Sequence, residues 1–264
     1  MTDLELLLGC IICILTLLQY YFYRFYYTKE KEKESEKQKS ENLPGAKTEK
    51  IIQPDDFVLN RRIEVLDSSL PADSWCRIDY FELNSKVGRT FKAKTANQTI
   101  TIDGFSNLGN IADHLSLGQL TNISRSLDTE EVRRNIGNGA ELIYTDGNLR
   151  VKCLSEKPIF VQSLSMNHRF GWHPETVTKL PSQCWLDIFN KNEFIDLLNV
   201  AAEKGYDDVN KLSQMCFIKL SFVKGWGIEF RIQEVSSVPC WIEITLLEPL
   251  QMIDKVITRM ALSH

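Results

Sequence analysis

Residues 217–246 read FIKLSFVKGWGIEFRIQEVSSVPCWIEITL, and the architecture of the chain is clearest here. The two ends, 217–223 and 241–246, are short runs rich in aromatic and β-branched residues, a composition typical of β-strands. Between them lies a polar loop in which two glycines flank a tryptophan and in which Lys224 and Arg231 are basic. The pattern predicts two strands joined by a loop with tight glycine turns and positive charge.

The same strand composition recurs upstream of this stretch. The further strand candidates are 75–82, 87–94, 98–103, 141–145, 148–154 and 159–163. Asp146 and Gly147 separate two of these candidates by the two residues that favour a tight hairpin. The sequence therefore predicts a protein built mainly from short antiparallel strands.

Helical spacing of apolar residues appears in four other places. The helix candidates are 128–136, 193–204, 206–215 and a last helix with Pro249 in its first turn. Asp128 and Glu131 form a candidate capping box for the first of them, which Gly137 would end. Short strands combined with these helices predict a mainly β fold with α: a two-sheet antiparallel β-sandwich with a three-helix bundle at one end.

Composition limits the function classes that fit. The chain has 264 residues, enough for one ordinary domain with appendages, and its net charge of -4 argues against binding nucleic acid through overall charge. The cysteines of the predicted domain stand singly, at Cys76, Cys153, Cys184, Cys216 and Cys240. Without clustered Cys and His, neither a zinc site nor another cofactor is expected. These cysteines are instead expected to be buried, reduced thiols of an intracellular protein.

The N-terminal residues differ from the rest of the chain. Residues 6–23 are an uncharged apolar run with acidic residues before it and basic residues after it. This favours a membrane anchor within 1–28 whose C-terminal side faces the cytosol; the alternative is a wrongly assigned start exon. Residues 29–73 begin with KEKEKESEKQKSE and are interpreted as a charged linker. The domain itself is expected at 74–264.

Several motifs follow one another in a family-specific order between about 74 and 260. They are YFELN at 80–84, IDGF at 102–105, LGQL at 117–120, IFVQS at 159–163, FGWHP at 170–174, SFVKGWG at 221–227 and PCWIEI at 239–244. In these motifs the chain resembles the Smad family, in its C-terminal effector or Mad-homology-2 domain. The resemblance implies a Smad/FHA-like sandwich flanked by a three-helix bundle and a loop-helix region, acting without catalysis.

The resemblance also implies a basic pocket that binds the phosphorylated Ser-x-Ser tail of a neighbouring subunit. Lys179, Lys224 and Arg231 match the family's phosphate-binding positions, and a phosphoserine with nearly two negative charges suits such cations. Phe230 stands where the family has a tyrosine, and Ile232 replaces an arginine. Weakened phosphate capture is therefore expected. The alternative is that the three cations form only a solvated rim.

The same loop matches the family's surface for choosing receptors and partners. The matching residues are Gly225, Trp226, Gly227, Arg231 and Glu234. Arg231 resembles the TGF-β and activin branch, whereas the acidic Glu234 resembles the bone-morphogenetic branch. The FGWHP motif leans toward the former branch.

For trimerisation, the resemblance implies an aspartate in the Asp-Gly-aromatic turn, Asp103, and another in the last helix, Asp254. An arginine that would reach them across the interface is replaced by His114. Neutral imidazole cannot bridge two carboxylates as a guanidinium does, although a protonated ring could in part. Weak self-association is expected; the alternative is that Asp103 only caps its own turn.

The function implied is that of an intracellular signal transducer and transcription regulator of TGF-β-type signalling. Expected partners are other Smads in homo- or hetero-trimers, a type I receptor serine/threonine kinase and transcription factors. Residues 1–73 are too few for the family's DNA-binding domain, so direct DNA binding is not expected, and the end at 261–264 implies a chain that accepts a phosphorylated tail without offering one.

The location expected for this role is the cytoplasm and nucleus. The alternative is an inhibitory decoy tethered to a membrane through 6–23, with its C-terminal domain in the cytosol. An enzyme is a third reading, with His168, His173 and Cys184 as a candidate nucleophile and base. No oxyanion loop or nucleophile elbow accompanies these residues, so an enzyme is not expected.

Overall fold

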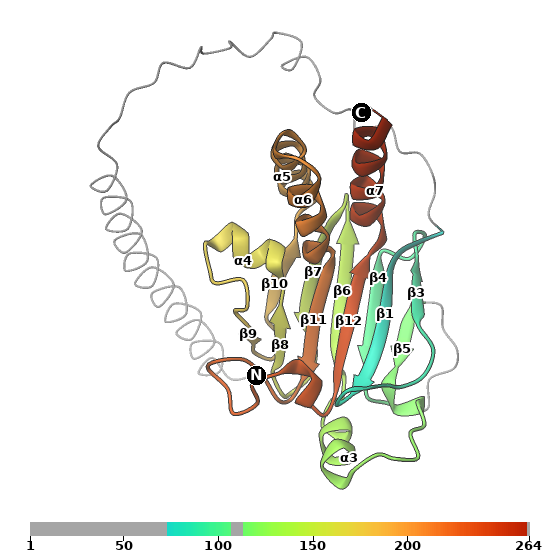
Figure 1. The fold of residues 1–264 in the computed structure, drawn as a ribbon. Helices are drawn as coiled ribbons and strands as arrows, with labels where there is room; N and C mark the ends of the chain where they lie inside the picture. Colours follow the sequence, from blue (N-terminus) through green and yellow to red (C-terminus); the bar gives the residue numbers. More distant parts are fainter. Residues whose placement is uncertain (1–72, 107–112, 263–264) are drawn as a thin grey trace, which may run out of the picture. The chain divides into compact units, whose positions relative to one another are not determined.

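Two β-sheets pack face to face in the computed structural model, which describes residues 73–106 and 113–262 (Figure 1). The larger sheet, sheet A, runs in the order β2-β1-β12-β11-β8-β9, and β3 also pairs with β1. Its strands are β1 (Ser74–Glu82), β2 (Ser85–Lys86), β3 (Phe91–Lys94), β8 (Ile159–Gln162), β9 (Thr178–Leu180), β11 (Phe217–Phe222) and β12 (Trp241–Leu246). The pairs β1–β12 and β11–β8 join strands that are far apart in the sequence, so the sheet depends on long-range pairing.

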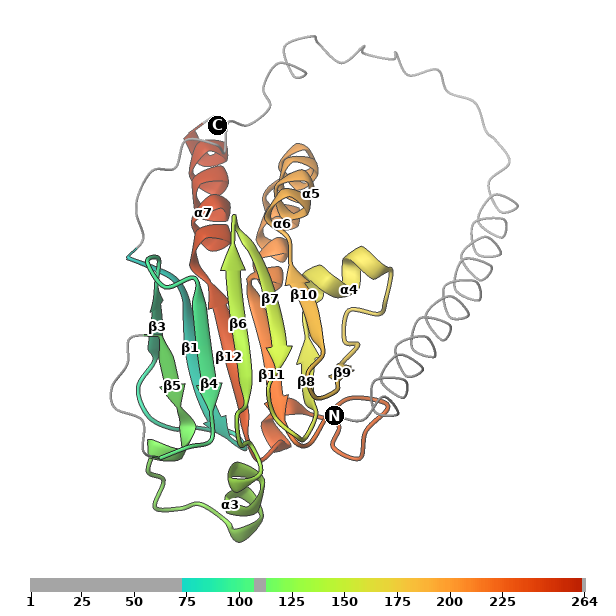
Figure 2. The ribbon, with the colours of Figure 1, turned by 180° about the vertical axis from the view of Figure 1, so that it is seen from behind.

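The smaller sheet, sheet B, forms the opposite layer and is seen from its own side in Figure 2. Its order is β10-β7-β6-β4-β5. The strands are β4 (Thr99–Asp103), β5 (His114–Ser116), β6 (Ala140–Thr145), β7 (Asn148–Cys153) and β10 (Trp185–Phe189). The expected two-sheet sandwich is confirmed, with one correction: β4 and β5 run parallel, whereas all other pairs are antiparallel.

The core lies between the sheets because alternate residues of each strand point inward. In β11 the inward residues are Ile218, Leu220 and Phe222, each at most 1% exposed. The outward residues of the same strand include Phe217 and Lys219, which face away from the core on the outer surface of sheet A. Inward residues thus form the core, whereas outward residues such as Phe217 and Lys219 lie on the outer face of the sheet.

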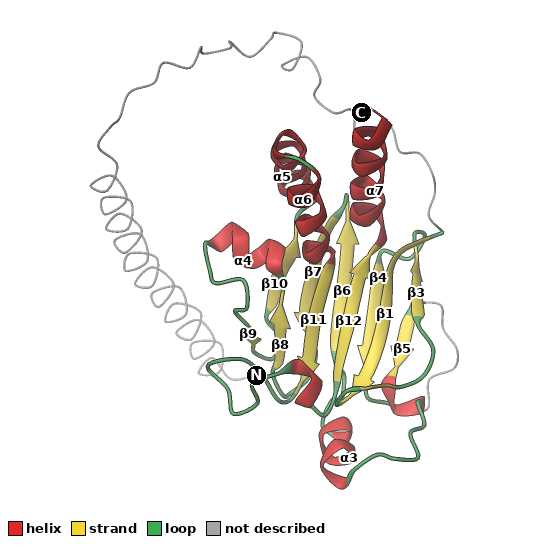
Figure 3. Ribbon diagram, viewed as in Figure 1, coloured by secondary structure: helices red, strands yellow, loops and turns green. Residues whose placement is uncertain are grey.

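The helices lie at the two ends of the sandwich (Figure 3). The three-helix bundle consists of α5 (Lys191–Lys204), α6 (Tyr206–Lys211) and α7 (Leu247–Leu262), and α4 (Leu164–Phe170) follows β8. At the opposite end, α3 (Leu127–Arg134) is capped by Ser126, whose hydroxyl accepts the Thr129 N–H at 3.2 Å. The N-cap predicted at Asp128 is therefore wrong by two residues. Ser126 directly precedes the helix, and its side chain takes the place of the missing backbone acceptor for the Thr129 N–H.

Most of the predicted strands and helices appear within a few residues of their expected ends. Four short elements have no clear pattern in the sequence: β5, α4, β9 and β10. No helix within 73–106 and 113–262 has the length and apolar character needed to cross a bilayer. The apolar run at 6–23 and all but the last residue of the linker predicted at 29–73 lie outside the described residues.

Candidate protein-interaction site

One row of residues crosses the outer face of sheet A and includes Lys179, one of the three cations predicted to bind phosphate. In strand register, Lys179 of β9 lies beside Phe160 of β8, and Phe160 lies beside Ser221 of β11. Directly opposed residues in antiparallel strands project to the same face. Lys179 therefore lies two strands from Ser221, and the chain reaches Lys224 three residues later.

The loop after β11 has its own small apolar core, separate from the main one. Phe160, Trp226, Val238 and Trp241 are each at most 6% exposed within this cluster. Phe230 packs edge-on against the Phe160 ring, with ring centroids 5.2 Å apart. These contacts fix the loop against the sheet, so the polar residues on its outer side are held in place.

Backbone geometry at the start of the loop sets the position of Lys224. Its N–H donates to the Phe222 carbonyl at 2.7 Å, and its carbonyl accepts the Ser221 hydroxyl at 2.7 Å. A Cβ added to Gly225 would lie 2.5 Å from the Phe160 ring, so only glycine allows this approach. Gly227 has φ +98, a conformation that side chains disfavour.

Three exposed cations surround this loop: Lys179, Lys224 and Arg231. None of them forms an ion pair within the part of the chain that the structure describes. Their charges are therefore available to an incoming anion. Glu229 and Glu234 are exposed on the same loop, so the surface has mixed charge.

The two positions of this loop where the sequence departs from the family pattern have a packing role. Phe230 belongs to the apolar cluster under the loop, and Ile232 forms a β-bridge with Trp226. The Ile232 carbonyl also accepts the Gly227 N–H at 2.9 Å. These side chains strengthen the loop's apolar contacts and supply no hydrogen-bond donor to a phosphate.

The structure brings together two of the three residues assigned to trimerisation. His114 Nε2 lies 2.5 Å from Asp103 Oδ2 of the same chain, on the neighbouring parallel strands β5 and β4. Asp103 is 2% exposed and its other oxygen accepts the Phe105 N–H at 3.1 Å, so it also caps its own turn. This contact lies within one chain, and a contact of His114 with a neighbouring subunit stays a prediction. Asp254 is exposed on α7, at the opposite end of the sandwich (Figure 1).

A buried ionic network beside this site was missed in the sequence. Glu82 is 3% exposed, and its carboxylate accepts hydrogen bonds from Arg125 at 2.8 Å, Asn122 at 2.7 Å and the Tyr80 hydroxyl at 3.1 Å. Strand alternation could have predicted it, because Glu82 lies on the same inward face of β1 as Ile78 and Tyr80. A carboxylate buried there needs a cation as a partner. The network ties the segment before α3 to β1.

The segment held by this network also exposes apolar side chains. Ile123 and Leu127 are essentially fully solvent-exposed, at 104% and 89%. Asn122 and Arg125 hold the same segment to the buried Glu82. Apolar groups displayed on a fixed segment suit contact with another protein.

The residues considered for an enzyme take ordinary structural positions. His168 is exposed on α4, and His173 accepts the Glu175 N–H through Nδ1 at 3.2 Å. Cys184 is half-buried before β10, and its carbonyl accepts the Cys153 N–H at 2.9 Å. Within the described ranges, no three His, Cys, Asp or Glu side chains gather as a metal-binding group.

Among the solved structures that match the chain, two at low sequence identity illustrate the likeness. The interferon regulatory factor 9 IAD domain gives a TM-score of 0.48 with 12% identity, over 75% of this chain and 96% of that one. A chain of STAT2 in complex with IRF9 gives 0.48 with 14% identity, over 71% and 99%.

The family comparison covers most of the chain. The model of the MH2 domain matches residues 73–247, which include both sheets and the loop after β11. An MH2 domain is a protein-interaction domain of signalling proteins, which agrees with a loop fixed by apolar packing and an outer surface of unpaired cations. The chain belongs to the Smad family and carries that family's MH2 domain.

Proposed function

We propose that this protein transduces TGF-β-type signals and regulates transcription by phospho-dependent binding to Smads, receptor kinases and transcription factors. The observation that supports the proposal is the placement of Lys179 on β9, two strands from β11, and of Lys224 and Arg231 on the loop that follows β11. A phosphoserine needs several cations at once, and a preordered loop lowers the entropic cost of binding it.

The test uses the full-length chain and a labelled peptide with two phosphoserines in a Ser-x-Ser sequence. We expect the phosphorylated peptide to bind more tightly than its unphosphorylated form. Lys224→Ala should cost about 1.5–3 kcal/mol of that affinity, the value of a charged hydrogen bond. Lys152→Ala, on β7 of the other sheet, is the matched control. Equal affinities for the two peptides would exclude phosphate recognition.

A second role is favoured by the apolar run at 6–23, which precedes a basic flank. In this role the protein is an inhibitory decoy that holds receptors or activated Smads at a membrane. Fractionation separates the two roles. A decoy pellets with membranes and resists carbonate, with its MH2 domain open to protease from the cytosolic side. A soluble, partly nuclear full-length protein would support the transcriptional role instead.

A further inference from the structure

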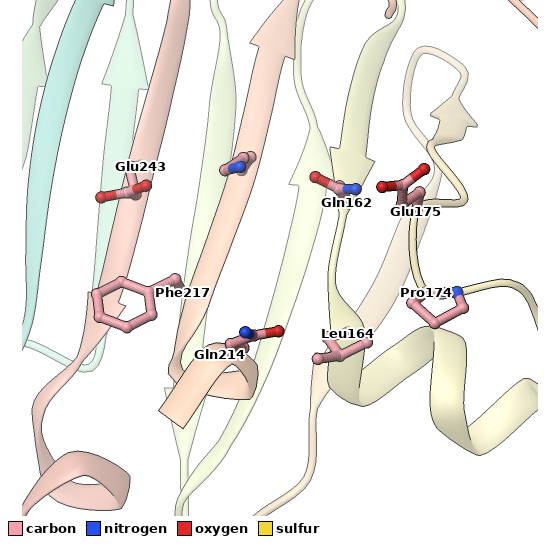
Figure 4. A pocket seen from close by; sticks show the side chains of 8 residues that line it. Gln162, Leu164, Pro174, Glu175, Gln214, Phe217 and Glu243 are labelled. Carbon is pink, nitrogen blue, oxygen red and sulfur yellow. The ribbon is translucent and has the colours of Figure 1, made fainter. Parts of the chain in front are cut away.

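A groove of about 420 Å³ lies on the outer face of sheet A, and none of the three cations described above lines it (Figure 4). It is lined by Gln162, Leu164, Pro174, Glu175, Gln214, Phe217, Lys219 and Glu243. Figure 4 shows these side chains in two rows: Glu243, Gln162 and Glu175 in one, and Phe217, Gln214, Leu164 and Pro174 in the other. One side of the groove is thus polar and the other mainly apolar.

The polar row follows from strand register. Glu243 of β12 lies opposite Lys219 of β11, and Lys219 lies opposite Gln162 of β8. Neighbouring strands are about 4.8 Å apart, so Glu243 and Gln162 are roughly 10 Å apart along this row. That distance corresponds to about three residues of an extended peptide, which rises about 3.3 Å per residue.

The far wall of the groove is fixed by buried hydrogen bonds. Asn167 is fully buried, and its Nδ2 donates to the carbonyls of Pro174 and Thr176, both at 2.9 Å. The Glu175 N–H is held by the His173 ring. The wall formed by Pro174 and Glu175 therefore keeps its shape before a ligand arrives, which lowers the cost of binding.

The electrostatics of the groove favour a cation. Burial raises the pKa of Glu243, the charge of Lys219 opposes this shift, and the charge of Asp79 adds to it. Among residues 73–106 and 113–262, no ion pair or hydrogen bond reaches the Glu243 carboxylate. Glu175 supplies a second, exposed carboxylate. The groove thus has two carboxylates, Glu243 and Glu175, and one ammonium, that of Lys219. A positive side chain of a ligand would compensate the negative charge of Glu243, which is partly desolvated.

The opposite row supplies apolar contact. Phe217 is 38% exposed although it belongs to a central strand, and Leu164 and Pro174 continue its surface across the groove. Exposed aromatic and aliphatic groups beside desolvated polar ones are typical of protein-binding surfaces.

We infer that this groove binds an extended segment of a partner protein in which basic and apolar residues alternate. Side chains of an extended chain point alternately to opposite sides. Basic side chains would pair with Glu243 and Glu175, while the apolar ones contact Phe217, Leu164 and Pro174. The groove shares no residue with the proposed phosphate site, so it adds a second docking surface that stands independently of it.

The test uses the full-length chain and a fluorescein-labelled peptide, Leu-Arg-Leu-Arg-Leu, followed by fluorescence anisotropy. We expect it to bind at least about tenfold more tightly than Leu-Gln-Leu-Gln-Leu, since a charged hydrogen bond contributes that much. The peptide Arg-Arg-Leu-Leu-Leu has the same composition without alternation and should also bind more weakly. Glu243→Gln and Phe217→Ser should each weaken the alternating peptide several-fold, whereas Lys224→Ala should not.

Several outcomes would overturn the inference. One is equal affinity of the alternating peptide for the wild type and for Glu243→Gln; another is no binding at about 1 mM peptide. Equal binding of the two arginine peptides would show simple charge attraction instead of a built groove. If Glu243→Gln does not fold, the exposed Glu175→Gln decides the same question. If Lys224→Ala loses phosphopeptide binding and still binds the alternating peptide, the groove acts independently of the phosphate site.

Discussion

The buried ion pair between Glu82 and Arg125 gives the sharpest prediction about stability. Arg125 places its guanidinium 2.8 Å from Glu82, and it also donates to the Leu120 carbonyl at 2.8 Å. Burial would lower the pKa of Arg125, but its hydrogen bond and charge interaction with Glu82 outweigh this and raise it. The pair is therefore strongly coupled, and Arg125→Met would leave a buried carboxylate without its cation.

The expected cost of Arg125→Met is about 3–5 kcal/mol, the range for removing one partner of a buried pair. The matched control is Arg134→Met, whose side chain is 76% exposed and pairs with Glu130. An exposed pair contributes about 0–1 kcal/mol, so the control should be nearly silent. The measurement is urea unfolding followed by tryptophan fluorescence.

A double replacement separates the pair's coupling from simple loss of packing. Combined with Glu82→Gln, the Arg125→Met change should cost clearly less than the sum of the single changes, by about 1–3 kcal/mol. If Arg125→Met costs under about 1 kcal/mol, as its exposed control does, then the pair does not hold the segment before α3. Additive single effects would lead to the same conclusion.

Three further predictions follow from other contacts. The hydrogen bond from Arg133 lowers the pKa of Glu130 to about 2, so its stabilisation is complete above the unfolded value of about 4.3 and is lost as pH falls toward 2. In Glu130→Gln, the stability lost between pH 5 and pH 2.5 should shrink by about 1–2 kcal/mol in urea unfolding. Gly225→Ala should destabilise by about 1–3 kcal/mol in thermal unfolding, because its Cβ would overlap the Phe160 ring; an unchanged midpoint would show that the loop can move. An arginine in place of His114 would put a permanent positive charge beside the buried Asp103. His114→Arg should therefore strengthen self-association by about 1–3 kcal/mol per contact in sedimentation equilibrium, and no change would place His114 away from any interface.

The sequence alone determined the elements with strong local periodicity. The strands around the loop after β11 alternate inward and outward residues, and α5 and α7 carry regular apolar stripes, so their existence follows from local pattern. The order of family motifs identified the MH2 domain, which the family comparison over 73–247 confirms.

Tertiary structure decided which residues meet. Lys179 lies two strands from the start of the loop that carries Lys224 because β9, β8 and β11 pair side by side, although 45 positions separate the two lysines in the chain. Strand order is set by packing between distant segments, and no local pattern encodes it. The parallel pairing of β4 and β5 likewise brings His114 to Asp103 in one chain. Local preferences fixed which residues of a strand face outward, and the long-range pairing of strands determined their neighbours.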